Sequence, residues 1–370
     1  MSSPIHIAHI VGKMVGGGVE SVIMNYYRHI DRNSIQFDFI IDNDSTLVPE
    51  EEIESLGGRV IRISPYGQPL QYHRDLYTIF KENHYIIVHS HINTLSVFPL
   101  FAAKRAGVPV RIAHNHSTAA KGELKKNVLK YMLRPFAKLF PTHLCACSEY
   151  AARWMFGKAS SANGDIKIIP NAIDLSKFHF SNDTRNNCRR QLGLEDKFVV
   201  GHVGRFMYPK NHQFLIDIFY EVTKKDESAV LLLIGTGKLR QGIQDKVHLL
   251  KLNNTVKFLG YREDIAEMMK AMDVFVLPSF CEGLPVVGVE AQATGLPCVF
   301  SDRVPREAKM SPMAEFVRLD AGAENWAKVV LSYRGFRERH EYHVDSPMYD
   351  ITYAANELKE YYLRLYTECS

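Results

Sequence analysis

The chain has 370 residues, of which 46% are hydrophobic and 23% are charged, and its formal net charge at pH 7 is +4. This composition is ordinary for a globular protein, and the small positive excess gives no reason to expect a nucleic-acid partner. At roughly 100–200 residues per domain, the length predicts two domains.

Cysteine spacing and hydropathy bear on metal motifs, redox motifs and membrane segments. The six cysteines lack the spacing of a zinc or thioredoxin motif, so most are expected to be small buried residues in a reducing compartment. The chain contains no run of about 18 apolar residues, and its first apolar run is too short for a secretory signal. We therefore expect neither a membrane-spanning helix nor a signal peptide.

Short apolar strands alternate with helices through the first half of the chain. The first strand is expected at 5–11, followed by a glycine-containing loop at 12–18 and an amphipathic helix at 19–30. Further strands are expected at 37–42, 58–63, 85–91, 110–116, 143–148 and 166–171. Strands that alternate with helices predict parallel βαβ units.

The pattern pauses at 181–196, a polar, turn-rich stretch that we interpret as a linker plus a short helix, and then resumes. Strands are expected at 197–204, 229–235, 256–260, 273–278 and 297–302, and a terminal helix at 351–366. Two successive α/β runs predict two doubly wound, Rossmann-like domains that face each other across a cleft, because ligands bind beyond the carboxyl ends of parallel strands. The predicted domains are 1–180 and 181–350, with 351–370 as a helix that packs back on the first.

Two glutamates stand in an apolar, turn-forming stretch at 279–297, SFCEGLPVVGVEAQATGLP. Glu282 follows a buried strand, and Pro285 suits the first turn of a helix. Glu290 would lie about one and a half turns into that helix. The simplest interpretation is that Glu282 complements the helix dipole and Glu290 faces water, but apolar neighbours leave Glu290 little polar face.

The start of this helix could instead bind an anion. The free backbone amides around Gly283, Leu284 and Val286, together with the helix dipole, form a site suited to a phosphate. A carboxylate further along, here Glu290, could bind the two hydroxyls of a ribose, as acids do in dinucleotide sites. The sequence therefore offers a nucleotide site as the alternative.

Two cations follow the strand expected at 197–204. Gly204 and Arg205 end that strand, and Lys210 comes five residues later. An arginine fork and a lysine point charge at the carboxyl end of a strand would neutralise a diphosphate. Solvated surface charges are the alternative.

The glycine-containing loop at 12–18 is not the dinucleotide-binding fingerprint. Its three consecutive glycines would let the backbone approach a ligand closely, or would simply form a tight turn.

Two pairs of histidines end two of the expected strands. His89 and His91, and likewise His114 and His116, are two residues apart, so each pair lies on one face of its strand. Structural histidines, contacts to a polar substrate and a zinc site are all open, although no cysteine or carboxylate joins them at ligand spacing.

The segment 121–140 is basic and amphipathic. Its cations, which face the single acid Glu123, are Lys121, Lys125, Lys126, Lys130, Arg134 and Lys138. Apolar residues recur near helical spacing, and Pro135 should interrupt the helix. Such a helix could lie on an anionic bilayer or could be a core-facing helix with a lysine-rich solvent side.

Taken together, these stretches resemble the retaining glycosyltransferases of family four, which have the GT-B fold. Residues 279–297 resemble the family's signature of two glutamates separated by seven residues, and 204–211, GRFMYPKN, resemble its Arg/Lys phosphate motif. Further similar segments occur in the family's order at 168–178, 231–239 and 256–279. The resemblance covers most of 5–300, is loose beyond that, and is closest to bacterial capsular and exopolysaccharide transferases.

The resemblance implies roles for individual residues. Arg205 and Lys210 would bind the diphosphate, Glu290 the ribose, and Glu282 the transferred sugar near its anomeric centre. A histidine of the first domain would contact the donor sugar, and the choice between His114 and His116 stays open. The residues implied in donor binding are Gly16, Gly17, Gly204, Arg262, Gly283, Leu284, Pro285, Val286 and Glu290.

The implied activity is transfer of a sugar, with retention of configuration, from a nucleoside diphosphate sugar, expected to be a UDP-sugar. The expected acceptor is a lipid-linked saccharide in capsular or exopolysaccharide synthesis. The protein would then be cytoplasmic and would attach through 121–140 to the anionic inner face of the cell membrane. Neither a cofactor nor a metal is expected. Rival hypotheses are a non-catalytic nucleotide-sugar sensor, a sugar-nucleotide epimerase of the same fold, and a metal hydrolase that uses the four histidines.

Overall fold

A computed structural model describes residues 3–118, 124–336 and 347–369. The chain forms two compact units. Within the described residues, unit 1 comprises 3–118, 124–173 and 347–369, and unit 2 comprises 174–336.

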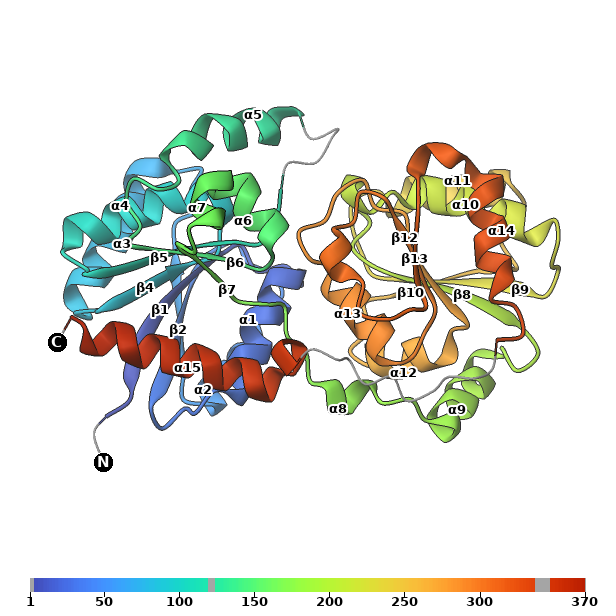
Figure 1. The fold of residues 1–370 in the computed structure, drawn as a ribbon, viewed down its shortest axis with the longest axis horizontal. Helices are drawn as coiled ribbons and strands as arrows, with labels where there is room; N and C mark the ends of the chain where they lie inside the picture. Colours follow the sequence, from blue (N-terminus) through green and yellow to red (C-terminus); the bar gives the residue numbers. More distant parts are fainter. Residues whose placement is uncertain (1–2, 119–123, 337–346, 370) are drawn as a thin grey trace. The chain divides into compact units, whose positions relative to one another are not determined.

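Unit 1 contains a seven-stranded parallel sheet in the order β3-β2-β1-β4-β5-β6-β7, with helices on both faces (Figure 1). Its strands are β1 (Ile5–Gly12), β2 (Ile35–Asp42), β3 (Arg59–Ile63), β4 (Ile87–Ser90), β5 (Val110–Asn115), β6 (His143–Ala146) and β7 (Ile166–Ile168). Its α-helices are α1 (Gly18–His29), α2 (Glu50–Ser55), α3 (Pro69–Glu82), α4 (Val97–Ala106), α5 (Leu124–Leu133), α6 (Glu149–Phe156), α7 (Lys158–Ala162) and α15 (Ile351–Thr367).

Unit 2 contains a six-stranded parallel sheet in the order β10-β9-β8-β11-β12-β13. Its strands are β8 (Phe198–Val203), β9 (Ala229–Ile234), β10 (Val256–Gly260), β11 (Val274–Leu277), β12 (Cys298–Ser301) and β13 (Ala314–Val317). Its α-helices are α8 (Leu175–Phe178), α9 (Asn182–Leu192), α10 (His212–Thr223), α11 (Arg240–Leu249), α12 (Ile265–Ala271), α13 (Val286–Ala293) and α14 (Ala323–Ser332). Strands such as β8 and β9 are buried along their whole length, as expected when helices cover both faces of a parallel sheet.

The predicted fold class, two doubly wound Rossmann-like units, is confirmed, and every strand expected from the sequence is present. The edge strand β13 was not predicted, because only Ala314 in it is fully buried and its pattern is too short to stand out. The stretch 181–196 contains a full helix, α9, capped by the Ser181 side chain, rather than mostly linker. Pro285 is the N-cap of α13, just before its first turn.

Both sheets have a point where the strand order reverses. In unit 1 it lies between β1 and β4, and in unit 2 between β8 and β11. Loops that leave the carboxyl ends of these neighbouring strands diverge to opposite faces, and ligands of such folds bind there. The glycine loop, the histidine pairs, the two cations and Glu282 follow these four strands or their neighbour β5.

The C-terminal helix α15 belongs to unit 1, where it packs against α1. The Asp350 carboxylate caps it by accepting hydrogen bonds from the amides of Thr352 and Tyr353. Two of its tyrosines, Tyr361 and Tyr362, are buried against the sheet. Residues at the very end of the sequence therefore complete the core of the first unit.

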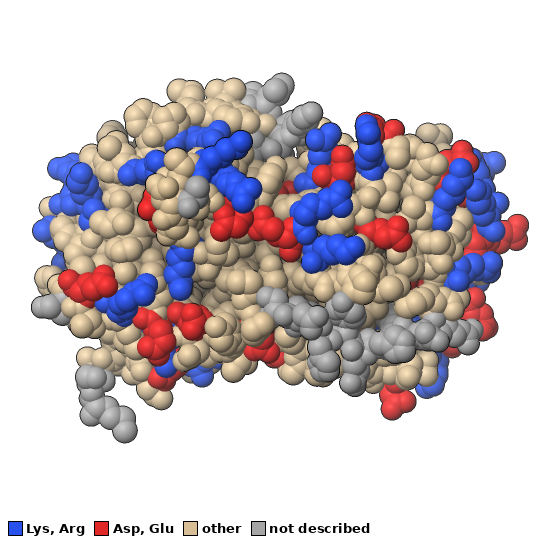
Figure 2. All heavy atoms as spheres, viewed as in Figure 1, with Lys and Arg blue, Asp and Glu red and all other residues tan. Residues whose placement is uncertain are grey.

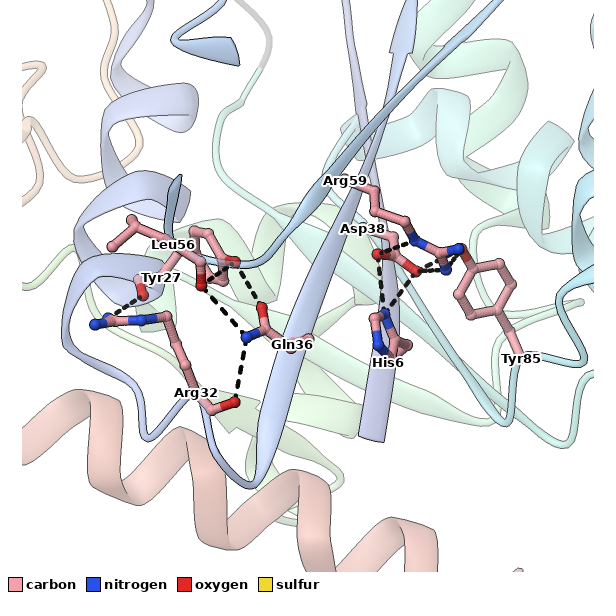
Figure 3. Close-up of polar contacts among 8 residues, drawn as sticks. All are labelled: His6, Tyr27, Arg32, Gln36, Asp38, Leu56, Arg59 and Tyr85. Carbon is pink, nitrogen blue, oxygen red and sulfur yellow. Dashed lines mark hydrogen bonds and ion pairs between the residues drawn. The ribbon is translucent and has the colours of Figure 1, made fainter. Parts of the chain in front are cut away.

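A buried carboxylate ties the outer strands of unit 1 together (Figure 3). Asp38 on β2 is fully buried and accepts hydrogen bonds from Arg59 Nε at 2.9 Å and Tyr85 Oη at 2.7 Å. His6 Nδ1 lies 3.1 Å from the same carboxylate. Burial by itself would raise the pKa of Asp38, but the hydrogen bonds from Arg59, Tyr85 and His6 outweigh it and hold the pKa below its usual range.

The surface carries both signs of charge. Figure 2 shows Lys and Arg side chains interspersed with Asp and Glu over the visible face, in keeping with the small net charge. Within the described ranges, no helix has the length and apolar character needed to cross a bilayer.

Candidate active site

The loops after β8 and β11 meet at the point where the strand order of unit 2 reverses. Lys210 Nζ donates a hydrogen bond to Glu282 Oε1 at 2.8 Å, and both side chains are mostly buried. Ser279 Oγ donates to the same oxygen at 2.7 Å. Asn211 Nδ2 binds the carbonyl of Pro278 at 3.0 Å, which fastens one loop to the other. The structure thus joins the phosphate motif to the first glutamate of the glutamate signature.

Glycines allow these loops to pack closely. A Cβ at Gly204 would lie 3.3 Å from Cδ and Cε of Lys210, so the missing side chain leaves room for the lysine to reach Glu282. Gly235 and Gly237 follow β9 at positive φ, and a Cβ on them would meet the carbonyl oxygens of Gly204 at 2.2 Å and Phe206 at 2.6 Å. Only glycine fits at these two positions.

Arg205 is exposed at the carboxyl end of β8, and within the described residues its guanidinium has no hydrogen-bond or ion-pair partner. An arginine left unpaired beside the Lys210–Glu282 pair is available to an anionic ligand.

Helix α13 carries the second glutamate in its second turn. Gly283, Leu284 and Pro285 are buried ahead of the helix, Val286 begins it, and no side chain caps it. The first amides of a helix have no acceptor within the helix, so they remain available to a ligand. The partly exposed Glu290 carboxylate has no hydrogen-bond partner among the described residues. Burial raises its pKa to about 7, although the nearby Lys210 charge acts in the opposite direction.

Arg262 lies elsewhere in unit 2. It follows the edge strand β10 and pairs with Asp264, its Nε donating to Asp264 Oδ1 at 2.6 Å. The structure does not bring it into the Lys210–Glu282 contact, and its predicted role in donor binding stays a prediction.

The glycine loop of unit 1 lies between β1 and α1, with Gly16 at positive φ. The carboxylate of Glu20 turns back and accepts hydrogen bonds from the amides of Val15 at 3.1 Å and Gly17 at 2.7 Å. Gly17 is the N-cap of α1 and has no side chain, so Glu20 supplies the return hydrogen bond of a capping box without its partner. The sequence reading overlooked Glu20, which already occupies two amides of this loop.

The four predicted histidines come together in the core of unit 1, and His9 of β1 joins them. His9 Nδ1 lies 2.9 Å from His91 Nε2, and His91 Nδ1 lies 3.0 Å from His116 Nε2. A second series of hydrogen-bond contacts joins three other rings. Tyr362 Oη lies 2.6 Å from His89 Nδ1, and His89 Nε2 lies 3.1 Å from His114 Nδ1. His91 and His116 lie just beyond the carboxyl ends of β4 and β5.

Burial keeps these imidazoles neutral. Loss of water lowers the pKa of His9 and of His116 to about 3, and it lowers the pKa values of His89, His91 and His114 well below their usual range, with further help from neighbouring histidines. Two groups of three have ligand nitrogens within 4.8 Å of one another and could hold a metal ion: His9, His89 and His91, and His91, His114 and His116.

A D-x-D triplet, Asp42–Asn43–Asp44, begins at the last residue of β2, so the premise that the chain lacks a D-x-D motif, used to expect no metal, is wrong. Asp44 pairs with Lys13 of the glycine loop. Burial, with a smaller contribution from the Asp44 charge, raises the pKa of Asp42 to about 6. Neither aspartate belongs to a group of three ligands within the described part of the chain.

The basic segment 121–140 is described from Leu124 onward, and Lys121 and Glu123 lie outside the described residues. Helix α5 ends at Leu133, and the 3₁₀ turn that follows contains Pro135, as expected from its missing N–H. Lys130 Nζ donates to the carbonyl of Thr118 at 2.9 Å. The large apolar side chains exposed on this segment are Val128, Leu129, Tyr131, Met132, Phe136 and Leu139.

The sequence therefore located the loops but not all their partners. Ser279, Gly235, Gly237 and His9 were within reach of pattern reading, because each follows or lies in a recognised strand. Tyr362 was not, since 273 residues separate it from His89.

Two family models match the chain. One described as Glycosyltransferase Family 4 matches residues 16–177, and one described as Glycosyl transferases group 1 matches residues 197–331. EpsF of Bacillus subtilis (strain 168), assigned as a glycosyltransferase, is 38% identical over 82% of this chain and 80% of that protein. A UDP-Gal:alpha-D-GlcNAc-diphosphoundecaprenol alpha-1,3-galactosyltransferase of Escherichia coli is 32% identical over 61% of this chain and 60% of that protein.

Similarity also extends to a capsular polysaccharide enzyme and to solved structures. The glycosyltransferase CapH of Staphylococcus aureus is 24% identical over 97% of this chain and 99% of that protein. Anabaena HepE in complex with UDP-glucose has a TM-score of 0.81 and 19% identity, covering 97% of this chain and 100% of that chain. The lipopolysaccharide glycosyltransferase WaaG has a TM-score of 0.70 and 14% identity, covering 96% and 94%. Both structural likenesses bear on the fold, which is that of GT-B glycosyltransferases.

Proposed function

This chain belongs to the family 4 glycosyltransferases, and from that premise we propose that it transfers a sugar from a UDP-sugar to a lipid-linked saccharide, with retention of configuration. We further propose that the product is part of a capsular or extracellular polysaccharide. The names of the Escherichia coli and Staphylococcus aureus relatives support the donor, the acceptor and the process, and the UDP-glucose complex of HepE supports the donor.

One observation carries the nucleotide part of the proposal. At the strand reversal of unit 2, Lys210 and Glu282 are paired, while Arg205 and Glu290 have no partner within the described residues. The unpaired Glu290 carboxylate is partly desolvated, which is costly unless a ligand completes it, and the exposed Arg205 is free to bind an anion. A nucleoside diphosphate supplies both complements, phosphate oxygens for Arg205 and ribose hydroxyls for Glu290.

The chemistry assigned to these residues is electrostatic. Arg205, Lys210 and the first amides of α13 would stabilise the negative charge that develops on the leaving diphosphate. The hydrogen bonds found for Glu282 use Oε1 and leave Oε2 for a hydroxyl of the transferred sugar. His114 or His116 would contact the same sugar. We propose that these cations replace a metal, so that activity survives a chelator.

The test is a panel of nucleotide sugars screened by thermal shift, because a bound donor raises the unfolding temperature by mass action. The donor that stabilises the protein is then offered with and without a lipid-linked acceptor. Transfer to the acceptor supports the proposal. Binding without transfer or hydrolysis would favour a sensor, and isomerisation of the donor without acceptor would favour an epimerase.

The exposed apolar surface of α5 and the turn after it supports a further part of the proposal, attachment to the inner face of the cell membrane. Single exposed apolar residues are common, but six large ones within one short segment are unusual. Arg134, whose guanidinium lies 5.5 Å from the Trp154 ring, borders this segment. Apolar side chains flanked by cations are the pattern of a helix that lies in a membrane interface.

A further inference from the structure

The histidine cluster contains more rings than contact with a substrate requires. All five imidazoles are buried: His116 is 7% and His91 5% exposed, whereas His9, His89 and His114, on three neighbouring strands, are at most 2% exposed. A buried histidine that cannot reach a substrate can affect binding or catalysis only through a neighbouring ring that does reach it. His91 is the ring that hydrogen-bonds to His116, while His114 stacks on it.

The number of N–H groups on the three rings limits how they can hydrogen-bond to one another. A neutral imidazole has one N–H and one bare nitrogen, so each ring donates once and accepts once. The chain His9–His91–His116 contains three N–H groups and two hydrogen bonds. One N–H is left over, and it must be at one of the two ends: His9 Nε2 or His116 Nδ1. Both atoms are buried and have no partner in the described residues.

The surroundings of the two ends differ. The His9 ring stacks on Phe37 with a centroid separation of 3.9 Å, and the edge of the Tyr362 ring closes another side. Among the described residues His9 Nε2 has no acceptor within this aromatic enclosure, and an orphaned N–H is rarer in protein interiors than an under-satisfied acceptor. The spare N–H is therefore assigned to His116 Nδ1, because His116 follows the carboxyl end of β5 and is 7% exposed, against 1% for His9.

We propose that His91 is a positioning residue, which holds the His116 ring and fixes its tautomer so that Nδ1–H is presented as a neutral donor to an oxygen of the sugar donor. The proposal rests on the proposed function only in assigning that oxygen to the sugar donor. His9 completes the chain by supplying the N–H that His91 Nε2 accepts. In this arrangement all the protons are placed before substrate binds.

A metal ion in the same cluster is the competing occupant. The candidate ligand groups consist of histidines alone. A divalent ion there would add two buried positive charges without a carboxylate ligand, and the nearby Asp38 is already engaged by Arg59. Histidines alone can nevertheless hold a zinc ion, so metal binding is one of the outcomes tested below. Nitrogen separations of 2.9 and 3.0 Å are those of direct hydrogen bonds.

The first test needs no measurement of activity. The full chain is labelled with ¹⁵N-histidine, His116 is assigned with the His116→Gln variant, and the ring ¹⁵N shifts are recorded without ligand. The expected result is a proton on Nδ1 and a bare Nε2. A proton on Nε2 would overturn the proposal.

The second test compares two amides at position 91. The amide of His91→Asn reaches the place of the imidazole Nδ1 and can still donate to His116. The amide of His91→Gln reaches the place of Nε2 and can bond only to His9. We expect His91→Asn to keep kcat/KM for the donor within about threefold and His91→Gln to lose roughly tenfold, the effect of one hydrogen bond. The exposed His84→Asn is the control and should match the wild type.

The outcomes separate this inference from the proposed function. Affinity for UDP should be equal in both variants, because the residues proposed to bind the diphosphate and ribose are in unit 2. Equal losses of kcat/KM in the two variants, or tight stoichiometric Zn²⁺ binding that both variants abolish, would refute the positioning role. A wild-type protein that turns over no nucleotide sugar would refute the proposed function, while the tautomer measurement would still decide the state of His116.

Discussion

Lys210 and Glu282 are 72 residues apart in the chain and meet at 2.8 Å. The contact exists because β8 and β11 are neighbours at the strand reversal of unit 2, so that the loops leaving them end in the same place. Each side chain neutralises the other in a mostly buried setting, which leaves Arg205 as the cation free for a ligand within the described residues.

The first prediction concerns these cations. Replacing Arg205 or Lys210 by Ala should lower kcat by roughly 10²-fold or more, because each is assigned to the charge on the leaving diphosphate. The measurement is steady-state turnover with the donor found by thermal shift. Lys328→Ala, which removes an exposed cation of α14, should have no effect. Near-normal turnover by the Arg205→Ala/Lys210→Ala double variant would remove both residues from the mechanism.

The second prediction concerns Glu290 and pH. Because its pKa is raised to about 7, the carboxyl group ionises as pH rises through neutrality, and ribose hydroxyls donate best to the ionised form. Affinity for UDP should therefore rise between about pH 6 and 8 and then level off. Glu290→Gln should bind UDP more weakly, by very roughly 1–3 kcal/mol, and without that rise. Titration calorimetry at several pH values measures both effects.

Stability of the free protein should move the other way. A carboxyl whose pKa is higher in the folded chain holds its proton between about pH 4.5 and 7, where the unfolded chain has lost it. Ionising Glu290 therefore disfavours the folded state, and Glu290→Gln should be more stable than the wild type at pH 8.

A 2′,3′-dideoxy nucleoside diphosphate that binds the wild type as well as UDP would contradict the ribose assignment.

The third prediction concerns the buried Asp38. Asp38→Asn leaves Arg59 without its counter-charge and should lower the free energy of unfolding by about 2 kcal/mol or more. Its pKa is depressed in the folded state, so this stabilisation is present above the unfolded pKa and is lost as pH falls through the folded value. Urea unfolding at pH 7 and pH 3 measures it. Asp320→Asn, which breaks an exposed pair with Arg318, is the control and should change nothing measurable.

The fourth prediction concerns the apolar surface of α5 and its turn. The triple variant Met132→Ser, Phe136→Ser, Leu139→Ser should float less with anionic vesicles, and the loss should persist at high salt because burial of apolar area is not screened. Changing Lys125, Lys126 and Lys130 to Gln should weaken flotation mainly at low salt, where about 1 kcal/mol per cation is available. Leu70→Ser, on α3 and 87% exposed, should float like the wild type. Equal flotation of all four proteins with neutral and anionic vesicles would exclude the membrane proposal.

The sequence by itself determined the fold class and located the loops that follow the strands on which the candidate site is built. Alternating strands and helices specified two doubly wound sheets, because the periods of burial in a strand and in a helix are written locally in the order of apolar residues. Glycines and cations directly after strands, as at Gly204 and Arg205, indicated the carboxyl edge of the sheet, because a residue's position after a strand can also be read from the local sequence. Among the described strands, β13 alone was not predicted, because four residues with a single fully buried position are too short a pattern to stand out.

The tertiary structure alone decided which of these residues touch. Lys210 meets Glu282 because two strands distant in sequence are neighbours in the sheet. His89 contacts Tyr362 because helix α15, far along the chain, packs in unit 1. The raised pKa of Glu290 and the lowered pKa values of the histidines also come from the packing, since desolvation depends on atoms contributed by many segments. The local order of apolar residues does not specify these contacts, because each contact depends on which strands and helices pack side by side in the folded units.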